Sequence, residues 1–326
     1  MNIKKTIKFI ELRKYFFVLS LSLITIGLIS MGWTYFSKGD LNWGIDFSGG
    51  LAATIAINVD RDVEVQEVRD IFAKNGFDTV ISKINSEVLI EGAKNQFFIK
   101  MKIDDPEHLK DVVKAVEENI RKPLTEKYGD KIIIRDEEGY EPTIGRDLKK
   151  SAGMIVGLVI FLILIYIAMR FQFKFGIAAI ICLIHDSLIV IGISSLMGRQ
   201  ISISLIVAIL TLIGYSLNDT IIVFDRIREN SRNIHDQDYI FIINKSITQT
   251  LNRTIITSLT VELGALPIII VSALLGIDVL FDIVFFIAIG IVVGTYSSIF
   301  VASPLLYIWE NMAKKYGWGT RKRKTA

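Results

Sequence analysis

The feature that most constrains this chain is the clustering of its charges, which leaves long apolar stretches uninterrupted. No charged residue occurs between Lys14 and Lys38, and none occurs between Asp282 and Glu310. A helix needs about 20 apolar residues to cross a hydrocarbon core of about 30 Å, so both stretches are long enough. With 51% hydrophobic and 22% charged residues over 326 positions, the composition excludes an ordinary soluble domain. We therefore expect a polytopic α-helical membrane protein.

Six candidate transmembrane helices can be read between the charges. They cover residues 15–36, 151–169, 175–197, 201–224, 254–276 and 283–309. The first follows a basic stretch, but its apolar part is too long for a signal peptide and no cleavage-site pattern follows it. We expect this segment to be retained as a helix.

The distribution of Lys and Arg predicts the orientation. Six spans put both termini on one side, and residues 1–14 and 310–326 are both basic, so we expect both termini to be cytoplasmic. Lys149 and Lys150 lie at the opposite edge, against this bias. Residues 37–148 have a net charge of −7 and the remainder +10. The basic part is expected to face anionic membrane lipid and not nucleic acid.

Residues 37–148 are expected to form an external (periplasmic-side) domain. Strands are predicted at residues 51–59, 79–84, 96–103 and 131–135, with helices over residues 63–75 and from Asp105 onward. The second helix is expected to bury Val112, Val113, Val116 and Ile120. The order βαββαβ predicts a small α+β ferredoxin-like domain. His108 is interpreted as a solvated surface residue, and no catalytic grouping or metal spacing is visible, so we expect neither an enzyme nor a metal site.

Ionisable groups inside the predicted spans are costly and therefore suggest function. His185 and Asp186 lie near the middle of the third span, and Asn218 and Asp219 in the inner third of the fourth. For Asp186, a buried contact with His185 is favoured over a proton relay.

Arg253 lies at the start of the fifth predicted span, where it can approach Asp219 at a similar depth. A carboxylate beside a guanidinium stays ionised, and it takes a proton when that partner leaves. The pair is thus either a protonation switch, with Asn218 orienting the carboxylate, or a static ion pair. Glu262, further into the fifth span, is a third candidate that would face solvent in a cleft.

Two further patterns concern helix packing. Gly153 with Gly157, and Gly290 with Gly294, are spaced to allow close approach of helices. Apolar residues recur at helical spacing within residues 226–252, namely Ile240, Ile243, Ile247 and Leu251. This segment is interpreted as a cytoplasmic amphipathic helix on the inner leaflet, or alternatively as a helical hairpin.

Three blocks of sequence resemble the SecD/SecF family of bacterial protein-export membrane subunits, and its SecF branch in particular. They are Gly-Ile-Asp-Phe-Ser-Gly-Gly at residues 44–50, Gly-Tyr-Ser-Leu-Asn-Asp-Thr and its continuation at residues 214–230, and residues 250–254 together with residues 294–304. With the six-span plan, the likeness covers nearly the whole chain. The family is similar in layout to resistance-nodulation-division transporters. Gly44, Asp46, Gly49 and Gly50 of the first block are expected to form a structural motif.

The resemblance implies an accessory role in Sec-dependent export of preproteins across the bacterial cytoplasmic (inner) membrane, driven by the proton gradient. It implies SecD and the SecYEG channel as partners, with YajC and YidC as further candidates. No cofactor is expected, with H⁺ as the coupling ion and Na⁺ left open. Asp219 and Arg253 match family positions linked to proton passage, and the His185–Asp186 pair also has a family match. Glu262 departs from the family pattern.

Two other functions compete with this interpretation. A half-size resistance-nodulation-division exporter of small molecules or lipids is the first, although such exporters have a doubled chain. An intramembrane aspartyl protease built on Asp186 and Asp219 is the second, and it would need both carboxylates to face each other across a water-filled cleft.

Overall fold

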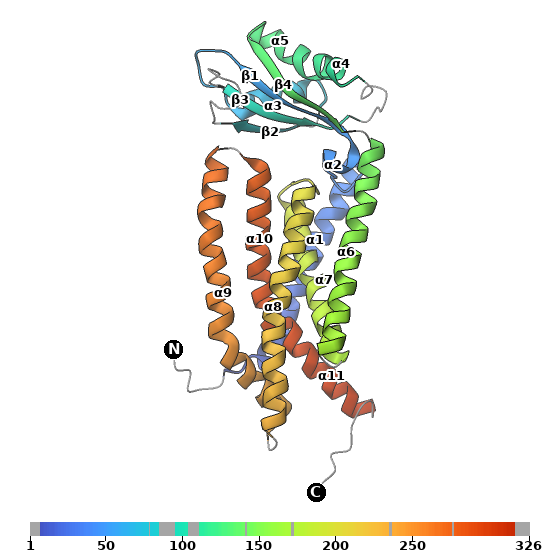
Figure 1. The fold of residues 1–326 in the computed structure, drawn as a ribbon, viewed down its shortest axis with the longest axis vertical. Coiled ribbons are helices and arrows are strands. Elements are labelled where there is room, and N and C mark those ends of the chain that lie inside the picture. Colours follow the sequence, from blue (N-terminus) through green and yellow to red (C-terminus); the bar gives the residue numbers. More distant parts are fainter. Residues whose placement is uncertain are drawn as a thin grey trace.

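The computed structural model describes residues 7–77, 79–84, 95–103, 111–140, 142–170, 173–234, 237–275 and 277–316. Within them the chain forms a bundle of long helices with a small sheet domain at one end (Figure 1). The predicted start of a helix at Asp105, and His108, lie outside the described residues.

Six helical segments of the described chain are long and apolar enough to cross a membrane, which confirms the predicted number. They are α1 (Arg13–Lys38), α6 (Pro142–Arg170), α7 (Phe173–Leu196), α8 (Ile203–Asn233), α9 (Tyr239–Leu275) and α10 (Asp278–Ser297). A π-helical turn at Ser298–Ala302 joins α10 to α11 (Ser303–Tyr316), so that the last span continues without a break. Most helices run beyond the predicted apolar limits, because a helix ends where its backbone hydrogen bonds end and not where charge begins.

The sheet domain contains four strands and several short helices. Its elements are α2 (Ile45–Ser48), β1 (Gly50–Ile57), α3 (Val65–Lys74), β2 (Thr79–Ile84), β3 (Asn95–Met101), α4 (Val112–Val116), α5 (Lys122–Tyr128) and β4 (Ile132–Tyr140). The strand order is β2-β3-β1-β4, and each neighbouring pair is antiparallel. This is the predicted ferredoxin-like arrangement.

The core of this domain lies between the sheet and its helices. Phe72 of α3, Phe97 of β3 and Ile120 after α4 are fully buried there. Val113 was expected in this core but is 66% exposed, because the helix continues through residues 117–128 and its buried face carries Ala115, Val116 and Ile120, beside which Val113 lies.

The segment at residues 226–252 differs from an in-plane amphipathic helix. The structure assigns its first part to the end of α8 and its second part to the start of α9, as the helical-hairpin alternative expects. Ile243 and Ile247 are buried against Phe9 and Ile10 from the N-terminal segment. Their apolar spacing therefore reflects packing inside the protein.

Residues 42–50, which we call the elbow, join the bundle to the sheet domain. The Gly44 amide donates to the Ile201 carbonyl and the Ile201 amide donates to Asn42, both at 2.9 Å. The Asp46 carboxylate accepts a hydrogen bond of 3.2 Å from the Ile203 amide at the start of α8. Gly50 has a φ of +151°, and a Cβ there would lie 2.2 Å from the Met101 carbonyl oxygen, so only glycine fits this turn. The elbow thus binds α8 and β3 at once.

Helices α1 and α7 cross where two glycines meet. A Cβ on Gly27 would lie 2.7 Å from the Cα of Gly192, so the two backbones are in direct contact. Sequence spacing does not reveal this pair because its members are on different helices. On α1, Gly32 has no heavy atom within 4 Å of the equivalent position and can serve as a control.

We expect Gly27→Ile to separate α1 from α7 and to lower the stability of the protein by about 1–3 kcal/mol, the usual cost of overpacking. Thermal unfolding of the detergent-solubilised chain measures this loss. Gly32→Ile should unfold close to the wild-type temperature, and equal shifts for the two variants would contradict the described crossing.

Glu67 of α3 joins two parts of the sheet domain through its carboxylate. It accepts hydrogen bonds from Arg61 at 2.5 and 2.8 Å and from the Tyr128 hydroxyl at 2.6 Å, and Lys127 lies at 3.0 Å. Hydrogen bonding from Arg61, then from Tyr128 and Lys127, lowers the pKa of Glu67 well below its usual range. The ionised form therefore stabilises the fold above the ordinary glutamate pKa of about 4.3, and this stability is lost as the pH falls toward the lowered pKa.

We expect Glu67→Gln to weaken hydrogen-exchange protection of α3 and the sheet at neutral pH and to flatten its decline below about pH 4. Hydrogen exchange across a pH series on the full chain measures both effects. Exposed Glu126→Gln is the control, and an unchanged acid profile for Glu67→Gln would refute the proposed linkage.

Candidate functional site

Asp186 lies at the centre of a buried polar network inside the bundle. Its side chain is fully buried, and His185 Nδ1 lies 2.8 Å from Asp186 Oδ1. Hydroxyl groups of Ser216 on α8 and Ser297 on α10 donate to Asp186 Oδ2 at 2.5 and 2.9 Å. Both carboxylate oxygens are therefore satisfied by groups from three different helices.

The network continues from α7 to α1 and α10. His185 Nε2 lies 2.9 Å from the Ser20 hydroxyl, which in turn is hydrogen-bonded to the Tyr296 hydroxyl. Tyr296 donates to the Phe16 carbonyl at 3.3 Å. A charged group at this depth is tolerated only when such partners surround it, and here they tie four helices together.

The approach of α8 to α10 depends on the predicted glycine pair. A Cβ on Gly290 would lie 3.0 Å from Leu212, and one on Gly294 would lie 2.9 Å from the Cβ of Ser216. Gly294 thus makes room for the serine that reaches Asp186. The other predicted pair, Gly153 and Gly157 on α6, has no heavy atom within 4 Å and packs against no helix of the described chain.

Asp219 lies on the same face of α8 as Ser216, three residues further along, but in different surroundings. It is 6% exposed, and its Oδ1 is buried without a hydrogen-bond partner. The carboxylate borders a cavity of about 10 Å³ that is also lined by Ser216, Ser258 and Thr295. That volume is at the lower limit of what one water molecule needs.

Arg253 is not paired with Asp219, and Asn218 lies differently from expectation. Arg253 on α9 is exposed, and its charge acts on Asp219 through space without an ion pair between them. Asn218 points out of the bundle, exposed, and does not contact the carboxylate that it was expected to orient. Adjacent residues of a helix point in directions about 100° apart, so burial of Asp219 turns Asn218 away.

Glu262 on α9 is half-buried, and its Oε1 has no hydrogen-bond partner. It is not part of the cavity beside Asp219. In the described part of the chain, no group of three or more His, Cys, Asp and Glu side chains is placed to hold a metal ion.

The arrangement gives the two membrane aspartates different chemistry. Asp186 is held by three side chains, whereas Asp219 must be balanced by a nearby charge or neutralised by a proton. The cavity beside Asp219 is far too small for a peptide, and the oxygens of Asp186 are occupied. This geometry does not provide the cleft that an aspartyl protease needs.

Sequence reasoning missed the hydroxyl groups of this site. Ser20, Ser216, Tyr296 and Ser297 are ordinary residues of membrane helices, and nothing in their spacing links them across helices. One usable signal was present, since Ser216 and Asp219 are three residues apart and therefore share a helix face.

Comparison with known proteins places these features in a family context. Residues 120–312 match the family model described as protein export membrane protein SecD/SecF, C-terminal. The protein translocase subunit SecF of Desulfurispirillum indicum is 38% identical, over 93% of this chain and 92% of that protein. The SecF subunit of Pseudomonas aeruginosa is 34% identical over 97% and 95%.

A solved structure is also similar. The crystal structure of SecDF from Thermus thermophilus has a TM-score of 0.72 and 34% identity, and the match covers 95% of this chain. This chain spans 40% of the length of that longer one.

We expect Asp186→Ala to lower the stability of the bundle by about 2 kcal/mol, because three interhelical or local hydrogen bonds of about 0.6 kcal/mol each are lost. Unfolding of the purified chain in mixed micelles measures the change. Thr211→Val is the matched control, since its exposed hydroxyl bonds only to Val207 of its own helix. A loss no larger than the control's would mean that the network does not hold the helices together.

Proposed function

This chain belongs to the SecD/SecF family of protein-export membrane proteins, and on that basis we propose that its bundle uses the proton gradient to drive preprotein export. The chain has an accessory role in the Sec translocase, in association with SecD. We further propose SecYEG as the channel that it serves, with YajC and YidC as additional partners. We also propose a bacterial inner-membrane location with both termini in the cytoplasm.

The observation that carries the proposal is the buried Asp219 carboxylate with one unpartnered oxygen. An ionised carboxylate in that position has one oxygen without a hydrogen bond, so it is suited to take a proton when one reaches it. A water in the small cavity would connect it with Ser216, Ser258 and Thr295. Asp219 is therefore proposed as the group that binds and releases the coupling proton.

Arg253 is proposed as the movable counter-charge. It acts on Asp219 through space but forms no ion pair with it in this structure. A shift of α9 along α8 would bring the guanidinium to the carboxylate and displace the proton. The structure described here then corresponds to the arrangement in which the two groups are apart.

Asp186 and His185 are proposed as the next groups that can exchange a proton, since Ser216 contacts Asp186 and also lines the Asp219 cavity. Glu262 is proposed as a further acceptor on α9, because its Oε1 is buried without a partner.

Movement reaches the sheet domain through the elbow. The Asp46 carboxylate accepts a hydrogen bond from the first amide of α8 and lies 3.8 Å from the Lys100 ammonium of β3. A displacement of α8 would therefore move the sheet. A cleft of about 640 Å³ between the sheet and the ends of α7, α8 and α10 gives the domain room to tilt. One proton crossing 100 mV supplies about 2.3 kcal/mol, which changes a two-state equilibrium by more than tenfold.

The small-molecule or lipid exporter is not favoured. The relatives that match nearly the whole chain are protein translocase subunits.

We expect Asp219→Asn to abolish the stimulation of export by the proton gradient, because the amide cannot exchange a proton. Import of a preprotein into inverted membrane vesicles, with and without an uncoupler, measures the gradient-dependent part, which should fall below about a tenth of wild type.

Asn218→Ala is the matched control, since this neighbour is exposed and does not contact the site. Full stimulation in Asp219→Asn vesicles that contain normal amounts of the protein would overturn the proposed mechanism.

A further inference from the structure

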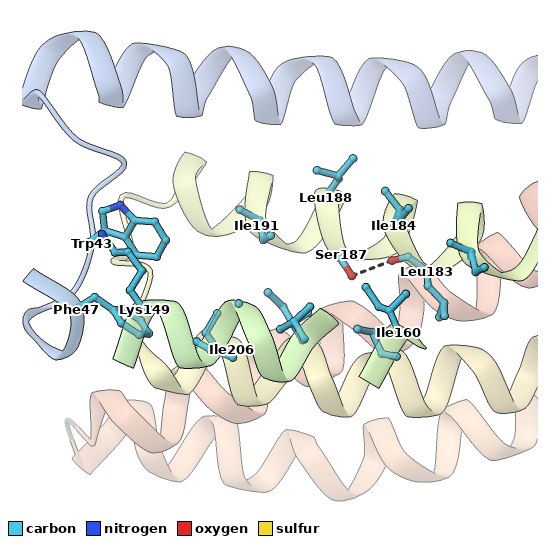
Figure 2. Close-up of a pocket in the computed structure, with 16 residues that line it drawn as sticks. Trp43, Phe47, Lys149, Ile160, Leu183, Ile184, Ser187, Leu188, Ile191 and Ile206 are labelled. Carbon is cyan, nitrogen blue, oxygen red and sulfur yellow. Dashed lines mark hydrogen bonds between the residues drawn. The ribbon is translucent and has the colours of Figure 1, made fainter. Parts of the chain in front are cut away.

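An apolar groove under α6 is a feature of the membrane part that the proposed function does not use. It has a volume of about 350 Å³ and lies between α6, α7 and α8. Its walls are almost entirely hydrophobic, with residues such as Val156, Ile160, Leu188 and Ile209. The Ser187 hydroxyl is turned to the Leu183 carbonyl of its own helix at 2.8 Å, so it offers nothing polar to the groove (Figure 2).

The groove exists because α6 does not pack on the bundle around Gly153, between its contacts at the sheet end and those of Val159, Ile163 and Ile167. At the sheet end, Gly145 packs so closely on the elbow that a Cβ would lie 2.7 Å from the Phe47 carbonyl oxygen. At the other end, Ile167 is 2% exposed and contacts Gly176. Between these points Gly153 touches nothing within 4 Å, and Ile184 on the facing wall is 48% exposed. The groove therefore opens toward the surrounding lipid.

A positively charged side chain lies at the sheet end of the groove. The Lys149 ammonium lies 3.8 Å from the centroid of the Trp43 ring, beside Phe47 (Figure 2). The nearby Asp40 carboxylate is taken by Lys102 at 2.5 Å, and Lys149 forms no ion pair within the described chain. Lys149 is one of the two basic residues that lie on the side of the membrane where few Lys and Arg residues are expected. A local interaction must therefore account for its position. A phosphate held at the membrane surface supplies that interaction.

The dimensions of the groove select its occupant. From Lys149 to Ile160 the helical rise of α6 is about 16 Å, close to half of a hydrocarbon core of about 30 Å. The length of the groove suits an extended acyl chain of one leaflet, and the cation at its sheet end suits a headgroup phosphate.

We propose that this groove binds one anionic phospholipid, with an acyl chain beneath α6 and its phosphate at Lys149 and Trp43. The lipid would belong to the leaflet on the side of the sheet domain. Because Trp43 and Phe47 are part of the elbow, the bound lipid contacts the segment that joins the sheet domain to α8.

The test counts lipid on the complex of this chain with SecD. The complex is extracted from vesicles of equal phosphatidylglycerol and phosphatidylcholine and measured by native mass spectrometry. We expect one retained phosphatidylglycerol, preferred over phosphatidylcholine about fivefold, which corresponds to about 1 kcal/mol for one lysine at the surface.

Two pairs of variants locate the lipid. Gly153→Phe fills the groove and should remove the retained lipid, whereas Gly157→Phe, on the same helix and also free of contacts within 4 Å but outside the groove, should not. Lys149→Gln should abolish the preference for phosphatidylglycerol, whereas exposed Lys150→Gln should keep it.

Retention that is unchanged by Gly153→Phe would overturn the proposal. Lipid that is retained by the isolated chain but lost when SecD is present would also overturn it, because SecD would then cover the groove. These readouts are independent of proton coupling, so their failure leaves the role of Asp219 untouched.

Discussion

The close approach of α8 and α10 is the constraint on which the interior of the bundle depends. Because Gly290 and Gly294 have no side chains, Leu212 and Ser216 can lie against the α10 backbone. At that separation Ser216 of α8 and Ser297 of α10 both donate to the same oxygen of Asp186. In lipid, where no hydrophobic force draws helices together, such packing and hydrogen bonding provide the association energy. Larger residues at the two glycines would leave a carboxylate buried with too few partners.

This packing gives the interior of the bundle two carboxylates of opposite character, Asp186 on α7 and Asp219 on α8. Asp186 is saturated with hydrogen bonds, which fixes four helices relative to one another. Asp219 has an oxygen without a partner and a small polar cavity beside it. An acid whose oxygens are all hydrogen-bonded gives a rigid framework. An acid with an unpartnered oxygen gives a site that responds to a proton or to an approaching cation. Both properties are needed if a small charge movement is to shift a whole domain.

The elbow fixes the position of the sheet relative to the bundle. Its residues share backbone hydrogen bonds with the start of α8, and a glycine with positive φ turns the chain directly into β1. Asp46 caps the positive end of α8 and faces Lys100, so electrostatic contacts cross from membrane to sheet. The short distance along the chain between helix and strand leaves little slack. The sheet domain is therefore held closely to the bundle and is not connected by a flexible linker.

The number of spans, the ferredoxin-like order of the sheet domain and the identity of the buried acids can be predicted from the sequence. These features follow from local properties, because hydrophobic length, alternation and the cost of buried charge depend on neighbouring residues. Three features could be found only in the folded structure, namely which hydroxyls meet Asp186, that Asn218 faces away from the site, and that Gly27 meets Gly192. Such contacts join residues that are far apart in the chain, and they depend on the rotation of each helix about its axis. The sequence of an apolar helix predicts that rotation only weakly, because the side that faces lipid and the side that faces the protein interior are both hydrophobic.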